Sequence, residues 1–462
     1  MKFFDVIVIG GGISGCEAAK KIAGYNKKVL LVEKEYIGGT CLNFGCIPSK
    51  FYLSVAKECE EIKHDIELGL IQGAVKPQLK SIMEKQHEVV EQLRNGMMLE
   101  LNQNYVEIIF GEAELNLMGN EKQVQIGEDL FCADYIILAN GSSSIIPSYD
   151  GIEESCMEKF VLTNREIFTM QQLLQKVVVI GGGVSGIEMA YILHELGSRV
   201  MVLEEADMIL RAVDRTLAFE LLQLLRKKGI DIILNCKVTD IVDGCVVFQK
   251  NEIEGVCECD GVYLSIGRKG NVEMLPEELK RTKDKRFLEV NDTYQTNIQG
   301  VYAIGDINGK SMLAHSASMQ AEIAVEDIFE KEYIAQKKNA IPQIIYTHPE
   351  VAYVGLTEEK AKAEGILYSV AELSMNYSGR YVIENREMTK HGMIKLIISD
   401  NETILGGGFI SCYASELIST LATVINQSMT CDEILQMIYP HPTEIEVIRD
   451  CIKKWKQKRE RD

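Results

Sequence analysis

One stretch near the start of the chain decides its fold: Val6-Ile7-Val8-Ile9-Gly10-Gly11-Gly12-Ile13-Ser14-Gly15-Cys16-Glu17. A β-branched run leads into Gly-x-Gly-x-x-Gly, and a second apolar run then ends in an acid. Such a unit binds a dinucleotide, because its glycines let the pyrophosphate approach backbone N–H groups at a helix N-terminus while the acid accepts a ribose hydroxyl. The candidate residues are Gly10, Gly12, Gly15 and Glu33.

The same pattern recurs later, as Val177-Val178-Val179-Ile180-Gly181-Gly182-Gly183-Val184-Ser185-Gly186-Ile187-Glu188. The distance from the last glycine to the acid at the end of the next apolar run is equal in both copies and close to the ~20 residues expected of a ribose-binding carboxylate. One such motif is a weak signal, but two in one chain predict two dinucleotide sites. The second would use Gly181, Gly183, Gly186 and Glu204.

The acidic residue of the second site indicates which dinucleotide binds there. A carboxylate at Glu204 accepts a hydrogen bond from a free 2'-hydroxyl and repels a 2'-phosphate, which favours NAD over NADP. Arg199 and Arg211 stand close enough in the sequence to leave NADP as an alternative.

Cys41 and Cys46 lie just after the first unit, in Gly38-Gly39-Thr40-Cys41-Leu42-Asn43-Phe44-Gly45-Cys46-Ile47-Pro48-Ser49-Lys50. Two thiols at this spacing can cycle between dithiol and disulfide. A zinc site would need further ligand pairs at short spacing, and the other close cysteines, Cys257 and Cys259, lie in an ordinary acidic stretch, so we expect no metal. Pro48 fits the first turn of a helix that begins near Cys46, where the helix dipole stabilises a thiolate.

Composition narrows the classes of function. A net charge of -19 would repel a phosphate backbone, which argues against nucleic-acid binding. The sequence contains no apolar run near the ~18 residues of a membrane span and shows no signal peptide before its first strand, so we expect no membrane association and a cytoplasmic protein. Most of the 13 cysteines are scattered, as is usual in a reducing compartment.

Further strands end in polar turns, the places where open α/β sheets bind ligands. Tyr135 to Leu138 leads to Gly141, Gly261 to Ile266 leads to Gly267, and Val301 to Ile304 leads to Asp306. A helix is expected from about Ala314 to Phe329. From Ile341 onwards the pattern changes to mixed strands and helices, which predicts a separate α+β domain.

A histidine framed by prolines stands near the end, in Tyr439-Pro440-His441-Pro442-Thr443-Glu444-Ile445-Glu446. Alone, such a histidine is more often a packed loop residue. With a dithiol to deprotonate elsewhere, histidine is the side chain best matched to base catalysis near neutral pH, and Glu446 can orient its imidazole.

In this order the motifs resemble the flavin-dependent pyridine nucleotide-disulfide oxidoreductases, most closely the members that oxidise dihydrolipoyl groups. The resemblance runs nearly end to end through 38–50, 345–350 and 441–446. It implies an α/β fold with two Rossmann-like dinucleotide-binding domains and a C-terminal α+β dimerisation domain. The implied boundaries are 1–147 for the first part of the FAD-binding domain, 148–267 for the NAD-binding domain, 268–339 for the remainder of the FAD and central region, and 340–462 for the interface domain.

The resemblance also implies roles for the candidate residues. FAD would be held by Gly10, Gly12, Gly15, Glu33 and Gly141, with Asp306 on its ribityl chain, the helix start at Ala314 toward the flavin N1/O2 edge, and Lys50 near N5 paired with Glu188. NAD would be held by Gly181, Gly183, Gly186, Glu188, Glu204 and Gly267. Cys46 would face the flavin, Cys41 would exchange with substrate, and His441 with Glu446 would be a base dyad from the opposite subunit of a homodimer.

The implied activity is oxidation of protein-bound dihydrolipoamide by NAD, with a lipoyl-bearing carrier protein of a 2-oxoacid dehydrogenase or glycine-cleavage complex as partner. Two alternatives stay open: an NADH-dependent reductase of another disulfide, and a mainly structural component of such a complex. Mercuric reduction is disfavoured because no adjacent cysteine pair ends the chain. The sequence departs from the family's usual residues at Asn140, Gly270, Ser316 and Tyr439.

Overall fold

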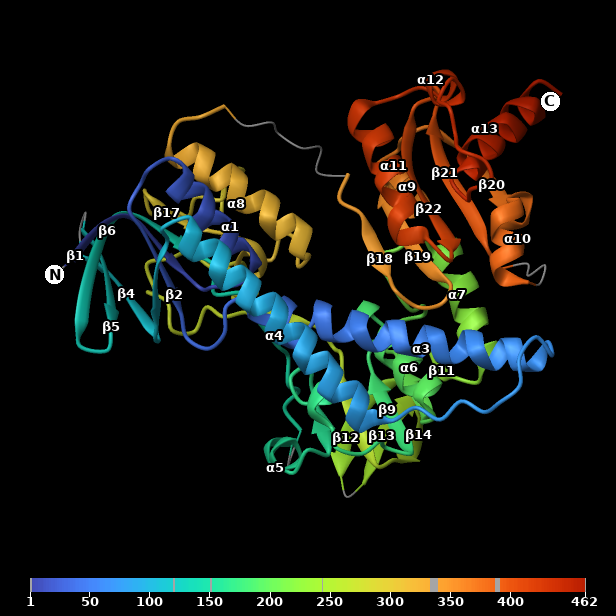
Figure 1. Cartoon of the computed structure of the whole chain (residues 1–462), viewed down its shortest axis with the longest axis horizontal. Helices are drawn as coiled ribbons and strands as arrows, with labels where there is room; N and C mark the ends of the chain where they lie inside the picture. Colours follow the sequence, from blue (N-terminus) through green and yellow to red (C-terminus); the bar gives the residue numbers. More distant parts are fainter. Residues whose placement is uncertain are drawn as a thin grey trace.

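The computed structural model describes residues 2–118, 121–149, 152–242, 244–332, 340–386 and 391–461. The expected boundary at 339 therefore lies outside the described residues. Figure 1 shows a first sheet near the N-terminus, a second in the middle of the chain and a third at the C-terminal end. None of the helices in these ranges is long and apolar enough to span a membrane.

The first fingerprint lies in the first sheet, whose strand order is β3-β2-β1-β6-β5-β4, with β17 pairing with the second half of β6. The central strands β1, β2, β3, β6 and β17 run parallel, and β4 and β5 form an antiparallel arm. The helices α1 and α8 lie side by side on one face, although they come from opposite ends of this unit (Figure 1). The bounds are β1 Lys2–Ile9, α1 Ile13–Gly24, β2 Val29–Glu33, β3 Glu107–Phe110, β4 Ala113–Met118, β5 Glu121–Ile126, β6 Asp129–Leu138, β17 Val301–Ala303, η2 Gly305–Asn308 and α8 Ala314–Ile328.

The second fingerprint lies in a parallel sheet of order β11-β10-β9-β15-β8. An antiparallel sheet of β12, β13 and β14 is inserted in the chain between β11 and β15, and β7 and β16 form a separate two-stranded antiparallel sheet. The bounds are β7 Ser142–Ser144, α5 Ile152–Met157, β8 Val161–Leu162, η1 Ile167–Thr169, β9 Lys176–Ile180, α6 Val184–Leu196, β10 Arg199–Leu203, α7 Arg215–Lys228, β11 Asp231–Ile233, β12 Lys237–Val242, β13 Cys245–Lys250, β14 Ile253–Glu258, β15 Gly261–Leu264 and β16 Arg268–Gly270.

The C-terminal unit is an antiparallel sheet of order β18-β19-β22-β21-β20 with helices against it, which confirms the expected α+β architecture. The bounds are β18 Gln343–Ile345, β19 Glu350–Gly355, α9 Glu358–Ala363, β20 Tyr368–Ser374, η3 Met375–Tyr377, α10 Gly379–Asn385, β21 Met393–Ser399, β22 Ile404–Ser411, α11 Ala414–Gln427, α12 Cys431–Leu435 and α13 Glu446–Arg459.

A long helix ties these units together at the redox motif. After the short helix α2 (Gly39–Phe44), α3 runs over Cys46–Glu67 and is followed by α4 (Leu79–Gln103). Apolar side chains of α3, including Tyr52 and Leu53, share one core with α6 and with Ile345 and Tyr353 of the C-terminal sheet. Figure 1 shows α3 between the second sheet and the C-terminal unit, and Cys46 is the first residue of this helix.

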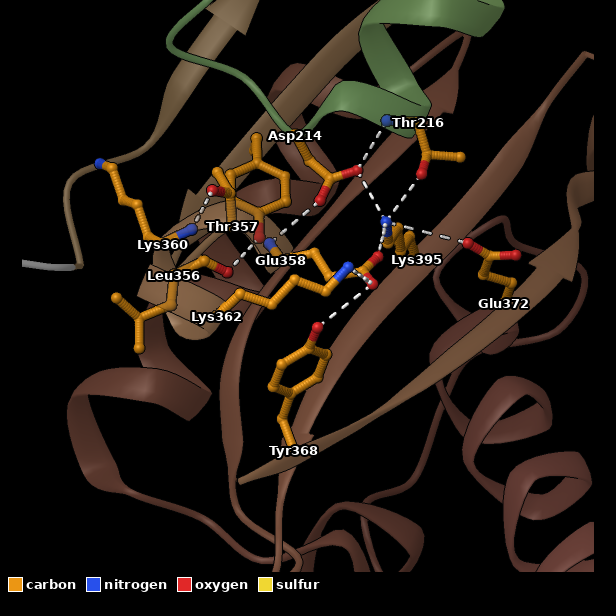
Figure 2. A network of polar contacts seen from close by, with 11 residues as sticks. Asp214, Thr216, Leu356, Thr357, Glu358, Lys360, Lys362, Tyr368, Glu372 and Lys395 are labelled. Atoms are coloured by element: carbon orange, nitrogen blue, oxygen red, sulfur yellow. Dashed lines mark hydrogen bonds and ion pairs between the residues drawn. The ribbon is translucent and has the colours of Figure 1, made fainter. Parts of the chain in front are cut away.

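A buried ionic cluster also joins the second and third units (Figure 2). Lys395 on β21 is 1% exposed and its ammonium lies 2.9 Å from an oxygen of Asp214, the fully buried N-cap of α7. It also donates to Thr216 at 2.7 Å and to Glu358 at 2.9 Å. All three ammonium hydrogens are thereby used. The cluster fixes the N-terminus of α7, which follows the loop after Glu204, against the C-terminal sheet.

Candidate redox and dinucleotide site

The first glycine motif forms a tight turn with an open concave side. Gly10 has φ of +109°, and a Cβ there would overlap the Ala139 carbonyl oxygen. A Cβ on Gly15 would overlap the Gly10 carbonyl oxygen. At Gly12, which precedes α1, a Cβ would meet no atom within 4 Å. The backbone at the start of α1 therefore faces open space, as the approach of a pyrophosphate requires.

The second motif repeats this geometry. Gly181 has φ of +103°, and a Cβ there would overlap the Ser265 carbonyl oxygen. A Cβ on Gly186 would likewise overlap the Gly181 carbonyl oxygen. Gly183, before α6, again faces open space. The sequence repeat is therefore a structural repeat, with two helix N-termini of the same form.

The two ribose-site acids are held alike. Glu33 accepts hydrogen bonds from the backbone N–H groups of Gly11 and Glu35, each at 2.7 Å. Glu204 accepts from the N–H groups of Gly182 at 2.5 Å and Ala206 at 2.7 Å. Each carboxylate is thus oriented by its own loop, and its remaining lone pairs can accept ribose hydroxyls.

Asp306 follows β17 in a short 3-10 helix and lies at the carboxyl ends of the first-sheet strands. Its carboxylate accepts the Ser142 hydroxyl at 2.5 Å, and the Arg268 guanidinium donates to that hydroxyl at 2.7 Å. Gly141 has φ of +69° and Gly267 has φ of +117°, so the turns next to Ser142 and Arg268 both use left-handed backbone. These two turns bring the expected strand ends together.

Three departures from the family's usual residues lie at confined positions. The Asn140 backbone carbonyl accepts from the Asn271 side chain at 2.7 Å, whereas the Asn140 side-chain oxygen is buried without a hydrogen-bond partner among the described residues. A Cβ on Gly270 would lie 3.0 Å from the Arg286 carbonyl oxygen, which leaves little room for a side chain. The Tyr439 hydroxyl is buried and donates to the Ile434 carbonyl at 3.2 Å.

The departure at Ser316 belongs to a local amide network at the start of α8. Gln320 accepts from the Gly305 N–H at 2.8 Å and from the Asn308 side chain at 2.7 Å, and its own amide lies 3.5 Å from the Ser316 hydroxyl. A neutral network therefore supports the turn that carries Asp306. The helix itself begins at Ala314, as expected.

The two cysteines stand at the junction of α2 and α3. Cys46 is the first residue of α3, which confirms the expected helix start, and both sulfurs are thiols. The Cys41 thiol hydrogen-bonds to the Cys46 sulfur, and this contact lowers the pKa of Cys46 to about 7, with the Lys50 charge assisting and burial opposing. The same contact raises the pKa of Cys41. Cys46 is therefore the more acidic thiol of the pair.

Lys50 lies one helical turn after Cys46 and meets residues from two other elements. Its ammonium is 3.0 Å from Glu188 on α6. It also lies 4.5 Å from the centre of the Tyr346 ring, and the Tyr346 backbone N–H donates to Glu188 at 3.0 Å. The pairing of Lys50 with Glu188 is the expected one. Tyr346 was missed as a site residue, because no local sequence signal links a residue after β18 to α3.

His441 and Glu446 form a pair in the C-terminal unit. The imidazole Nδ1 is 3.1 Å from Glu446, the first residue of α13. The Thr443 backbone N–H, together with the imidazole, lowers the pKa of the Glu446 carboxyl. The His441 side chain is 79% exposed and, within the described residues, makes no hydrogen bond or ion pair with Cys41 or Cys46.

A further acid near His441 was not singled out from the sequence. Glu444 is 3% exposed and accepts a hydrogen bond from the Ser411 hydroxyl at the end of β22. Burial raises the pKa of Glu444 to about 7. Within the described ranges, no group of three or more His, Cys, Asp or Glu side chains is arranged to hold a metal ion.

Comparisons with known proteins place this geometry in a family. Residues 4–321 match the family model described as pyridine nucleotide-disulphide oxidoreductase, and residues 341–451 match the dimerisation domain of the same family. The chain is 33% identical to a dihydrolipoyl dehydrogenase of Mycoplasma genitalium and 34% identical to one of Mycoplasma pneumoniae, in each case over 98% of both chains. It is 32% identical to a dihydrolipoyl dehydrogenase of Bacillus subtilis, over 96% of both chains.

Solved structures share the fold. LpdA from Mycobacterium tuberculosis superposes with a TM-score of 0.88 at 22% identity, covering 98% of this chain and 100% of that one. The HOCl-induced flavoprotein disulfide reductase RclA from Escherichia coli gives 0.84 at 23% identity, covering 97% and 99%. The structure has two helices that begin at glycine motifs and a third that begins at a dithiol, and the matches cover nearly the whole chain. The chain therefore belongs to the pyridine nucleotide-disulphide oxidoreductase family, which includes the dihydrolipoyl dehydrogenases.

Proposed function

We propose that this chain oxidises a protein-bound dihydrolipoyl group to the lipoyl disulfide and reduces NAD to NADH. The observation that carries the proposal is the Cys41–Cys46 pair at the start of α3, in a chain whose dihydrolipoyl dehydrogenase relatives align over 98% of both lengths. FAD and NAD are the cofactors of this chemistry. The domain boundaries expected from the sequence are part of the same proposal.

The residues present fit both dinucleotides. The open backbone at Gly12 and the oriented Glu33 carboxylate would hold FAD, with Gly10, Gly15, Gly141 and Asp306 completing its site and the start of α8 at Ala314 facing the flavin. Gly183 and Glu204 would hold NAD, with Gly181, Gly186, Glu188 and Gly267 around it. FAD, when bound, supplies two-electron transfer between a dithiol and a nicotinamide.

The side chains of the protein carry the thiol chemistry. His441 accepts the proton of one substrate thiol, and the resulting thiolate attacks the Cys41 sulfur of the Cys41–Cys46 disulfide, so that Cys46 leaves as a thiolate. His441 gives its first proton to solvent and accepts the proton of the second substrate thiol, whose thiolate attacks the substrate sulfur of the mixed disulfide and releases Cys41 as a thiolate. The substrate loses two electrons and two protons, and the cysteine pair gains the two electrons. The Lys50 charge favours the Cys46 thiolate, which suits the role of Cys46 as leaving group.

The base dyad acts on the dithiol of the other subunit. The exposed position of His441, its lack of contact with Cys41 in its own chain and the dimerisation-domain match support a homodimer in which each site uses both subunits. We expect Cys41→Ser and His441→Ala homodimers to be severely impaired. A mixed dimer of the two variants carries one intact site.

The mixed dimer is the test of this arrangement. Random reassociation of the two variants makes half of the dimers mixed, each with one intact site of two, so activity should recover to about a quarter of wild type. If base and thiol came from the same chain, purified mixed dimers carrying two different tags would be no more active than the parents.

The partner is proposed to be a lipoyl-bearing carrier protein of a 2-oxoacid dehydrogenase or glycine-cleavage complex, in the cytoplasm. The decisive experiment is a substrate screen of the purified protein in both directions, with free dihydrolipoamide, carrier-bound dihydrolipoyl groups and other disulfides. Faster turnover of carrier-bound substrate with NAD supports the proposal. NADH-dependent reduction of another disulfide without dihydrolipoamide oxidation would replace it, and no turnover at all would leave a structural role in the complex.

A further inference from the structure

Tyr346 brings the C-terminal unit into contact with the redox centre of the same chain. It lies in the turn between β18 and β19, and its half-buried ring lies 4.5 Å below the Lys50 ammonium of α3. Its backbone N–H donates to Glu188 of α6 at 3.0 Å. Tyr346 therefore contacts both Lys50 and Glu188, although it belongs to the C-terminal unit and they do not.

These contacts limit where the Lys50 charge can be. Lysine carries its charge on a flexible four-carbon stem. Glu188 binds the ammonium at 3.0 Å, and the Tyr346 ring attracts it as in other cation–π contacts. Among the described residues the ammonium has no further hydrogen bond, ion pair or ring contact. Without the ring, Glu188 alone would have to fix it.

The position of this charge matters at Cys46, four residues earlier on the same face of α3. The groups that act electrostatically on Cys46 are Cys41, Lys50, Glu188, Arg268 and the Tyr346 hydroxyl. Lys50 favours the thiolate and Glu188 opposes it. The balance between the two depends on the distance of the ammonium from the sulfur.

We propose that Tyr346 is a positioning residue of the redox centre, whose aromatic ring holds the Lys50 ammonium beside the Cys46 thiolate. The inference rests on the proposed function, because it takes Cys46 as the flavin-facing thiol. It adds that the C-terminal unit supplies part of the redox centre to its own chain, in addition to the base dyad that it supplies to the opposite subunit.

The test measures the pKa of Cys46 in holoenzyme that carries Cys41→Ser, where Cys46 is the remaining thiol of the pair. Its ionisation is followed by titrating the long-wavelength absorbance of the thiolate beside the flavin. Tyr346→Leu removes the ring but keeps the backbone bond to Glu188, and Tyr346→Phe keeps the ring without the hydroxyl. We expect the Leu variant to shift the pKa upward by about 0.5 to 1 unit and the Phe variant to stay within about 0.2 unit of its parent.

Two controls separate positioning from general damage. Tyr377→Leu removes a ring that lies beneath another lysine, Lys454, at 4.6 Å, and should leave the Cys46 pKa unchanged. In a Lys50→Met background, where no ammonium remains to be held, Tyr346→Leu should no longer shift the pKa. If the Leu variant fails to retain flavin, Tyr346→Met removes the ring in the same way.

The outcomes are distinct. An upward shift in the Leu variant that the Phe variant lacks, and that depends on Lys50, supports the inference. An unchanged Leu variant, an equal shift in the Phe variant, or a shift that persists without Lys50 overturns it. Loss of the long-wavelength absorbance from the Cys41→Ser parent would instead overturn the proposed role of Cys46.

Discussion

Replacing Lys395 with methionine should destabilise the C-terminal unit far more than a surface lysine would. Methionine keeps most of the apolar stem and removes the ammonium that lies 2.9 Å from Asp214 and 2.9 Å from Glu358. Asp214 is fully buried and keeps only backbone donors, the N–H groups of Thr216 at 3.0 Å and Glu358 at 3.3 Å. An uncompensated buried carboxylate costs about 3 to 5 kcal/mol of folding free energy.

The matched control is Lys362→Met, because Lys362 pairs with the same Glu358 carboxylate at 2.9 Å but is 66% exposed. An exposed pair of this kind contributes about 0 to 1 kcal/mol. The double variant Lys395→Met with Asp214→Asn removes both buried charges while the asparagine can still cap α7. It should recover at least about half of the loss, because the penalty comes from the unpaired charge.

The assay is urea unfolding followed by the fluorescence of Trp455, the one tryptophan of the chain, which packs in the same core as β21. A Lys395→Met protein within about 1 kcal/mol of its parent, or a double variant no more stable than the single one, would refute the reasoning. Either result would mean that the cluster of Figure 2 is relaxed by water or by rearrangement instead of being held as a buried ion pair.

Three further outcomes are expected. Two-electron reduction should produce long-wavelength absorbance that Cys46→Ser abolishes, whereas Cys41→Ser should show it without reductant; a band that survives Cys46→Ser contradicts the assignment of that thiol. In steady-state kinetics, kcat/KM should be higher with NAD than with NADP, because the Glu204 carboxylate gains a hydrogen bond from the 2'-hydroxyl and avoids repulsion by a 2'-phosphate, each effect being about 1 to 3 kcal/mol. Equal kcat/KM values would rule out Glu204 as the selecting group. Burial raises the pKa of Glu444 in the folded protein to about 7, above the value of about 4.3 in the unfolded chain. The neutral carboxyl therefore contributes its full stability below about pH 4.3, and this contribution is lost as the pH rises through 7. Glu444→Gln should therefore gain about 2 to 3 kcal/mol relative to wild type between pH 5 and pH 8, and a pH-independent difference in urea unfolding would contradict this.

The sequence determined those features that depend on neighbouring residues. Both dinucleotide units were readable because β-branched runs, glycine spacing and a terminal acid are local requirements of one strand–turn–helix–strand unit. The helix start at Cys46 was readable for the same reason, from Pro48 in its first turn. The family resemblance added roles for residues whose local sequence is uninformative, such as Asp306.

Tertiary structure alone decided the contacts between units. Nothing in the sequence around Lys395 distinguishes a buried ion pair with Asp214 from an ordinary strand lysine. The packing of α3 against α4 was not expected either. Tyr346 and Glu444 were read only as parts of motifs, yet their ring and carboxyl are placed by elements far away in the chain. The physical reason is that side-chain charge and burial depend on which surfaces meet in the folded protein, and that is settled by packing between distant segments.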